Sequence, residues 1–280
     1  MCLRIVIPQL NFKQGAIEYN LSKMLDAIAK NYEGKCLELY VFPELTLVGY
    51  QARDLIYYSA RSLDSELISK VIDFISDYPK AYVAFGFPEI DAEIKGVLYN
   101  SYVIVSKDGV IGHWRKTHLP TFTVFEEDRY FRENTKLYPP AEIGEFKVGA
   151  TICYDAFYSE LVRAQVLLGA DIILVPSGSP LQSMKLWEPI LKSRAIENTV
   201  FVVYSNHTGY KDGLLFFGKS RIVDPLGNVI IEAKLGEEDI IEYKIRRYDL
   251  LYARRVRPTL RDFRSTDIEN LVKAYKMSKL

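Results

Sequence analysis

Residues 4–44 have the sequence RIVIPQLNFKQGAIEYNLSKMLDAIAKNYEGKCLELYVFPE, which contains three segments with different hydrophobic patterns. The apolar run at 4–11 is typical of a buried strand, and a second run at 36–44 is closed by a proline. Between them, residues 16–32 repeat apolar side chains at the three- and four-residue spacing of a helix. A strand, a helix and a strand in this order predict a layered α/β fold.

The same alternation continues along the chain. We expect further strands at 81–87, 146–153, 171–177, 200–206 and 239–245, helices at about 62–77, 158–168 and 184–198, and hairpins at 98–116 and 216–233. Strands interrupted by hairpins favour mixed sheets. Because no linker-like segment separates the two halves, we expect residues 1–280 to form a single domain.

The composition argues against two classes of partner. Lys plus Arg and Asp plus Glu balance at 36 each, so no overall field favours nucleic acid or an anionic membrane. No apolar run approaches the roughly 18 residues that a membrane span needs, and the N-terminal run is too short for a signal peptide. We therefore expect a cytoplasmic protein that binds neither nucleic acid nor a membrane.

The cysteines and histidines suggest neither a disulfide framework nor a metal site. Cys2, Cys36 and Cys153 are an odd number at irregular spacing, which fits a reducing cytosol. The histidines show no HExxH spacing, and no CxxC motif accompanies them. We expect no bound metal.

Three reactive side chains follow apolar runs: Glu44 after LYVFP, Lys116 after VIGHWR and Cys153 after KVGATI. In layered α/β proteins, sites collect outside the carboxyl ends of strands. A carboxylate can take the proton of a thiol, and an ammonium can stabilise the oxyanion that forms when sulfur attacks a carbonyl carbon, together with the backbone N–H of Tyr154. Each residue also has an ordinary structural interpretation, as a surface charge or as a buried, inert sulfur.

The segments around these residues resemble the three motif blocks of the nitrilase (carbon–nitrogen hydrolase) superfamily, in the order that the family has them. The blocks are VFPELTLVGY (41–50), HWRKTHLP (113–120) and GATICYDAFYSE (149–160), and the likeness extends to GADIILVPSGSP (169–180), SRAIENTVFVVYSN (193–206) and SRIVDPLGNVI (220–230). The resemblance implies a four-layer α-β-β-α sandwich with two mixed sheets. It also implies a Glu44–Lys116–Cys153 triad, a thioester acyl-enzyme, and neither a metal nor an organic cofactor.

Within the superfamily, the chain is most similar to the glutamine-hydrolysing domain of NAD synthetase. The similarity is carried by FPELTLVGYQARDL (42–55) and RKTHLPTFTVFEEDRYF (115–131). It implies a second acidic residue at Glu127, with Glu126 as the alternative. It also implies substrate contacts from Ser179 and Lys185.

The chain departs from that branch in three places. Tyr154-Asp155 stands where the branch usually has Glu then Asp, and Phe122 stands where it often has a tyrosine near the substrate. Phe122 and Tyr154 remain candidates for substrate binding. The sequence ends at Leu280 without the SGG-x-DS loop of a synthetase domain, so we expect a stand-alone chain.

The segment RRYDLLYARRVRPTLRDFR (246–264) contains seven arginines and two aspartates. It is either a nucleic-acid patch or an Arg-rich tail that pairs with acidic groups of its own or a neighbouring subunit. The neutral total charge and the family resemblance favour the second interpretation. We expect residues 246–280 to pack at a subunit interface of a homodimer or a higher homo-oligomer.

These observations predict an amidase that hydrolyses a small carboxamide to an acid and ammonia. Glutamine is one candidate substrate, in which case the chain would be a glutaminase subunit that supplies ammonia to a separate synthetase. The alternatives are a stand-alone omega-amidase or aliphatic amidase, a nitrilase, or a catalytically inactive binding relative.

Overall fold

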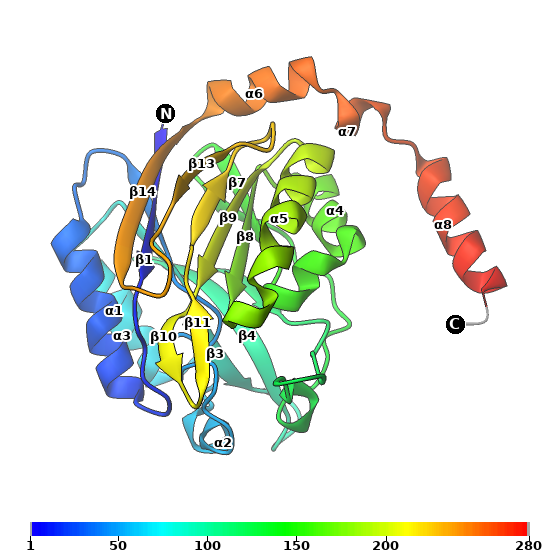
Figure 1. The fold of residues 1–280 in the computed structure, drawn as a ribbon. Coiled ribbons are helices and arrows are strands. Elements are labelled where there is room, and N and C mark those ends of the chain that lie inside the picture. Colours follow the sequence, from blue (N-terminus) through cyan, green and yellow to red (C-terminus); the bar gives the residue numbers. More distant parts are fainter. Residues whose placement is uncertain (1, 279–280) are drawn as a thin grey trace.

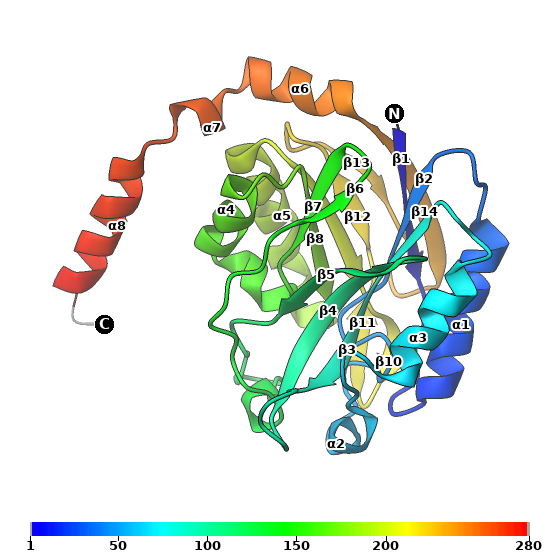
Figure 2. The same ribbon diagram turned by 180° about the vertical axis from the view of Figure 1, so that it is seen from behind.

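The computed structural model describes residues 2–278 and has four layers, with helices outside two facing sheets (Figure 1, Figure 2). Each of the two large sheets has six strands that run in mixed directions. The architecture confirms the α-β-β-α sandwich and the α/β fold that the sequence predicts.

The first sheet has the strand order β14-β1-β2-β3-β4-β5. Its strands are β1 (Cys2–Gln9), β2 (Leu37–Val41), β3 (Ala81–Ile90), β4 (Leu98–Ser106), β5 (Gly109–Arg115) and β14 (Asp239–Arg246). Helices α1 (Ile17–Asn31) and α3 (Glu66–Ile75) pack on its outer face, and the short α2 (Leu55–Ser59) lies at one end of the molecule (Figure 1). Because β1, β2 and β3 are parallel, their carboxyl ends meet at one edge.

The second sheet has the order β13-β12-β9-β8-β7-β6. Its strands are β6 (Ala141–Ile143), β7 (Phe146–Ala150), β8 (Ile172–Ser177), β9 (Phe201–Asn206), β12 (Arg221–Val223) and β13 (Val229–Glu232). Helices α4 (Ser159–Leu167) and α5 (Met184–Asn198) cover its outer face (Figure 1). A separate hairpin of β10 (Thr208–Lys211) and β11 (Leu214–Phe217), which the sequence analysis did not predict, follows β9.

The main core lies between the two sheets. Alternate side chains of each strand point into it, so that Ile5 and Leu39 of the first sheet share one apolar cluster with Val148 and Leu174 of the second. A second cluster, which includes Met24 of α1, lies between the first sheet and its helices. The two cores fix the facing sheet edges, where the reactive side chains emerge.

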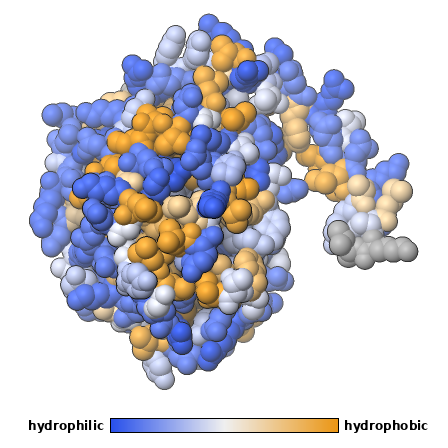
Figure 3. All heavy atoms as spheres, viewed as in Figure 1, coloured by the Kyte–Doolittle hydropathy of each residue, from blue (hydrophilic) through white to orange (hydrophobic). Residues whose placement is uncertain are grey.

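The C-terminal segment forms α6 (Arg247–Val256), α7 (Thr259–Asp262) and α8 (Ser265–Met277). Helix α6 is anchored to the body because Arg247 and Arg254 pair with Asp171 at 2.6 and 3.1 Å. Helix α8 buries no residue and projects away from the sheets, with apolar side chains on its surface (Figure 1, Figure 3). Among residues 2–278, no helix is long and apolar enough to cross a membrane.

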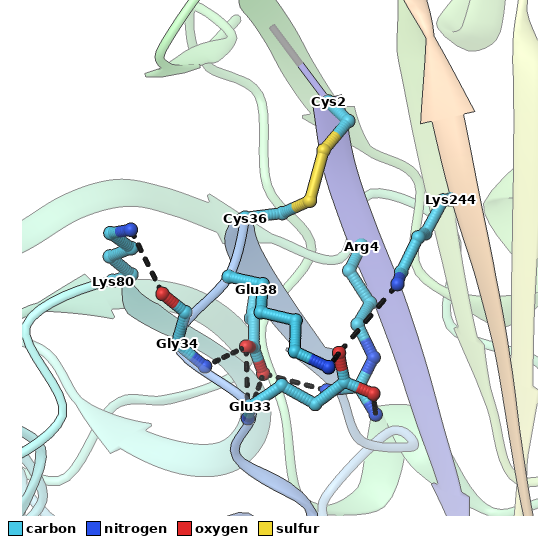
Figure 4. Close-up of a disulfide and its surroundings, with 9 residues drawn as sticks. Cys2, Arg4, Glu33, Gly34, Cys36, Glu38, Lys80 and Lys244 are labelled. Atoms are coloured by element: carbon cyan, nitrogen blue, oxygen red, sulfur yellow. Dashed lines mark hydrogen bonds and ion pairs between the residues drawn. A yellow bond between two sulfur atoms is a disulfide. The ribbon is translucent and has the colours of Figure 1, made fainter.

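A disulfide joins Cys2 to Cys36, which corrects the expectation that the cysteines form no disulfide framework (Figure 4). Strands β1 and β2 are parallel neighbours with Leu3 opposite Leu37, so the two preceding cysteines lie side by side, 5.8 Å apart between Cα atoms. Their separation of 34 residues in sequence hides this proximity. Because disulfides persist mainly in oxidising compartments, the cysteines no longer support the expectation of a reducing cytosol.

Candidate active site

Glu44 lies three residues beyond β2 and is completely buried. The next residue, Leu45, has a φ of 47°, which turns the chain sharply at this point. Gly86 of β3 permits the turn, because a Cβ atom at that position would lie 2.3 Å from the Leu45 nitrogen. One Glu44 oxygen accepts a hydrogen bond from the Gly178 N–H at 2.9 Å, and the other accepts one from Asn100 at 2.7 Å.

Lys116 follows β5 directly, and its ammonium is completely buried between two carboxylates. Its Nζ lies 2.7 Å from Glu44 Oε1 and 2.6 Å from Glu127 Oε1. Burial alone would lower the pKa of Lys116, but the negative charges of Glu127 and Glu44 outweigh it and raise the pKa. The side chain is therefore a permanent cation held in a fixed position.

Glu127 begins a short 3-10 helix, Glu127–Arg129, and points inward. Its carboxylate accepts hydrogen bonds from the Tyr50 hydroxyl at 2.5 Å and from Asn100 at 3.3 Å. Burial raises its pKa to about 7; Lys116 opposes this rise and Glu44 adds to it. The neighbouring Glu126 instead lies at the surface, 3.7 Å from Arg129, so Glu127 is the acidic residue that the fold brings to Lys116.

Cys153 lies at the start of the 3-10 helix Cys153–Phe157, three residues beyond β7. Its φ of 50° is unusual for a residue with a side chain and marks a tight turn that presents the sulfur at the strand end. The sulfur is 3.9 Å from the Ser179 hydroxyl. Burial, together with the negative charge of Glu44, raises the pKa of the thiol, and Lys116 opposes the rise. The resting sulfur is therefore a thiol that needs a base.

Two buried side chains hold the loop that carries Cys153. Asp155 accepts hydrogen bonds from the backbone N–H groups of Thr117 and His118 at 3.1 and 2.8 Å, which ties this loop to the residues after Lys116. Arg194 of α5 donates to the backbone oxygen of Ala156 at 2.8 Å.

His207 supports Glu44 from behind. Its Nε2 lies 2.6 Å from the Glu44 carbonyl oxygen, so this nitrogen carries the proton and donates. Burial lowers the pKa of His207 to about 3, and Lys211 lowers it further in the same direction. The imidazole is therefore neutral and acts as a fixed hydrogen-bond donor.

A cavity of about 290 Å³ opens onto Cys153. Its walls include Phe122, Tyr154 and Ser179, three of the four residues that the sequence suggests for substrate binding. The fourth, Lys185, lies on another face of α5, where it lines a separate cavity with Glu188 and other charged residues.

Sequence reasoning identified the strand ends but missed the side chains that link them. Asn100, Tyr50 and Asp155 are polar residues whose partners come from elements distant in sequence. Tyr50 and Asp155 fall within the motif blocks, but their partners cannot be read from those blocks, and no local pattern marks Asn100. Among residues 2–278, no group of three or more His, Cys, Asp or Glu side chains is placed to hold a metal ion.

The site can be compared with known proteins. The model of the carbon–nitrogen hydrolase family matches residues 4–255 of the chain. The chain belongs to the carbon–nitrogen hydrolase family. Members of this family use an active-site cysteine. In the part of the chain that the structure describes, Cys153 is the only free cysteine.

Relatives of this carbon–nitrogen hydrolase have several activities. It is 35% identical over 245 residues to a glutamine-dependent NAD(+) synthetase from Aquifex aeolicus, covering 85% of this chain and 41% of that protein. It is 33% identical over 263 residues to an (R)-stereoselective amidase from a Pseudomonas species, covering 91% and 92% of the two chains. The chain thus spans about two fifths of the length of the synthetases that it matches.

A solved structure shows the same fold. It is a mutant of the amidase from Nesterenkonia sp. AN1, with a TM-score of 0.80, 23% identity and coverage of 96% of both chains. In that protein, the acetamide moiety of fluoroacetamide is covalently attached to the active-site cysteine.

Proposed function

We propose that this carbon–nitrogen hydrolase is an amidase that converts a carboxamide to a carboxylic acid and ammonia through a thioester on Cys153. The observation that carries the proposal is the buried ammonium of Lys116, held at 2.7 and 2.6 Å by Glu44 and Glu127 at the strand end next to the thiol. The charges of Glu44, Lys116 and Glu127 all act on the pKa of Cys153, as expected for groups of one site.

Acylation begins with proton transfer from the Cys153 thiol to Glu44 while the sulfur attacks the carboxamide carbon. Lys116 and the backbone N–H of Tyr154 stabilise the oxyanion, and one such donor contributes about 3–4 kcal/mol. The tetrahedral intermediate collapses when Glu44 gives its proton to the nitrogen. The C–N bond breaks, ammonia leaves, and the acyl group remains on sulfur as a thioester.

Deacylation uses the same groups in reverse. Glu44 takes a proton from water, whose oxygen attacks the thioester carbon, and the sulfur recovers the proton when the carboxylic acid leaves. Glu127 keeps Lys116 in place and positions the substrate or the attacking water. The sum of the two halves is the addition of one water to one amide.

Glutamine hydrolysis is a second candidate, favoured by the 35% identity to the synthetase from Aquifex aeolicus. In that case the chain would supply ammonia to a separate ammonia-dependent synthetase. The acid product would be glutamate, and the chemistry at Cys153 would not change.

Intact-mass spectrometry after brief exposure to neutral amides and to glutamine tests the proposal, with ammonia release measured in parallel. We expect an acyl adduct of the wild-type chain, and neither an adduct nor ammonia from the Cys153→Ala variant. Its fold should be intact, because the change removes one sulfur atom. Ammonia release by Cys153→Ala at more than about one hundredth of the wild-type rate would contradict the nucleophile, since its loss costs several orders of magnitude.

A further inference from the structure

The cavity that opens onto Cys153 has aromatic walls. The ring centroids of Phe122 and Tyr154 are 5.4 Å apart, those of Tyr154 and Phe157 are 5.5 Å apart, and Trp187 follows at 5.2 Å from Phe157. Phe125, which also lines the cavity, lies 5.5 Å from Phe122 between ring centroids. Three of these pairs are in edge contact and the Tyr154–Phe157 pair is tilted, so the five rings form one continuous wall of the cavity.

Two apolar side chains of this cavity face solvent. Phe122 is 47% exposed and Leu186 is 53% exposed, although both line the hollow that contains the Cys153 sulfur. Exposed apolar groups that converge on a reactive atom are typical of a ligand-binding surface. An apolar group bound there would remove both from water.

Of the described residues 2–278, none that lines the cavity carries a charge. The charged residues next to lining residues in sequence have other partners: Asp155 accepts from the backbone of Thr117 and His118, Glu126 pairs with Arg129, and Glu188 pairs with Lys192. Lys185, suggested by sequence for the amino acid part of glutamine, lines a different cavity. Lys116, Glu44 and Glu127 lie beside Cys153 but are paired with one another. The ammonium and carboxylate of glutamine would therefore meet only uncharged side chains along the cavity walls, which is costly.

We propose that the substrates are neutral carboxamides with an aromatic or branched-alkyl acyl group, and that glutamine is a poor substrate. This inference rests on the proposed amidase function and specifies its substrate class. The carboxamide carbon lies at Cys153, and the apolar part of the acyl group packs against the aromatic wall. The reaction is unchanged, with one water consumed and one ammonia released.

The test compares kcat/KM for propionamide, 3-methylbutyramide, 3-phenylpropionamide, glutaramate and glutamine. We expect about a fourfold gain for each well-buried methylene and at least about a tenfold advantage of 3-phenylpropionamide over propionamide. Glutaramate and glutamine should fall below propionamide. A kcat/KM for glutamine equal to or above that for 3-phenylpropionamide overturns the inference.

A pair of matched variants tests whether the cavity wall distinguishes large apolar amides from small ones. Leu186→Ala should lower kcat/KM for 3-phenylpropionamide about three- to tenfold, mainly through KM, and should lower kcat/KM for the shorter propionamide by less. Leu167→Ala is the control, because Leu167 is 52% exposed on α4 and does not line the cavity. An equal effect of Leu186→Ala on both substrates overturns the assignment of the wall.

The two proposals fail in different ways. Turnover of glutamine or propionamide with an acyl adduct on Cys153, but without a preference for apolar amides, overturns the substrate class and leaves the amidase in place. If no amide is hydrolysed and no adduct forms on Cys153, both proposals are wrong.

Discussion

Lys116 is a buried cation between two carboxylates, so the group formed by Glu44, Lys116 and Glu127 carries a net negative charge when both carboxylates are ionised. Desolvating such a group is expensive, and only close partners compensate for it. Glu127, with a pKa of about 7, can hold a proton near neutral pH and reduce that excess charge. These buried charges therefore keep Lys116 positive, and the thiol of Cys153 stays protonated until a substrate arrives.

His207 should make the free energy of unfolding depend on pH in the acidic range. Its folded pKa is about 3, below the ordinary 6.5, so the unfolded chain takes up a proton first as the pH falls. The stabilisation that neutral His207 contributes to the fold is complete above pH 6.5. It is lost as the pH falls from 6.5 to 3, at about 1.4 kcal/mol per pH unit. We expect the stability difference between wild type and His207→Gln to shrink by about 2–3 kcal/mol between pH 7 and 4.5, measured by urea unfolding.

Activity provides a second readout for the same residue. Gln can still donate to the Glu44 carbonyl, whereas Leu cannot, so His207→Leu should lower kcat more than KM and His207→Gln should restore much of the loss. A stability difference that stays constant with pH would mean that the folded imidazole titrates normally, contrary to its burial.

At the scale of elements, the sequence predicts most strands and helices because apolar periodicity is a local property. The helix predicted at 184–198 matches α5 (Met184–Asn198), and the strand at 171–177 overlaps β8 (Ile172–Ser177). The missed hairpin β10–β11 carried a usable signal, since Asp212-Gly213 forms its turn with positive φ at both residues.

Helix and sheet geometry explains why the sequence placed Lys185 at the substrate and missed Asn100. On α5, successive side chains are about 100° apart, so Leu186 and Trp187 face the cavity while Lys185 faces a different one. Asn100 reaches Glu44 and Glu127 because of how β4 pairs with its neighbours, and that register is not written in the sequence around it.

The disulfide links the start of β1 to the start of β2, at the strand ends opposite to the active site. Closing a loop of 34 residues stabilises a chain by about 4 kcal/mol if the effect is entropic. We expect Cys2→Ser with Cys36→Ser to lower the free energy of unfolding by about 2–4 kcal/mol and to leave kcat/KM unchanged. Urea unfolding and amidase kinetics measure the two effects.

A thiol count in denaturant provides the control. The unreduced wild-type chain should show one reactive thiol, that of Cys153, and reduction should expose Cys2 and Cys36 as well. Three thiols without reductant, or an unchanged unfolding free energy in the double variant, would rule out a stabilising bond.

At the scale of the whole molecule, contacts within residues 2–278 do not account for the stability of α8. It has 13 residues and buries none of them, and a helix of that length is marginal alone in water. Ile268, Leu271, Val272 and Tyr275 are all exposed and follow the i, i+3, i+4, i+7 spacing of one apolar face. Such a face needs a partner, and the sequence analysis predicts a second copy of the chain.

We therefore expect a homodimer in which α8 packs on the neighbouring subunit. Leu271→Asp places a charge on the apolar face and should weaken dimerisation by at least about tenfold, because burial of one leucine contributes about 1.5–3 kcal/mol. Asn270→Asp adds the same charge to an adjacent, exposed position of α8 and should leave the dimer intact. Sedimentation velocity over a range of concentrations measures both variants. A wild-type chain that stays monomeric at about 100 μM, well above the micromolar affinities of weak specific complexes, would show that α8 does not bind a second copy.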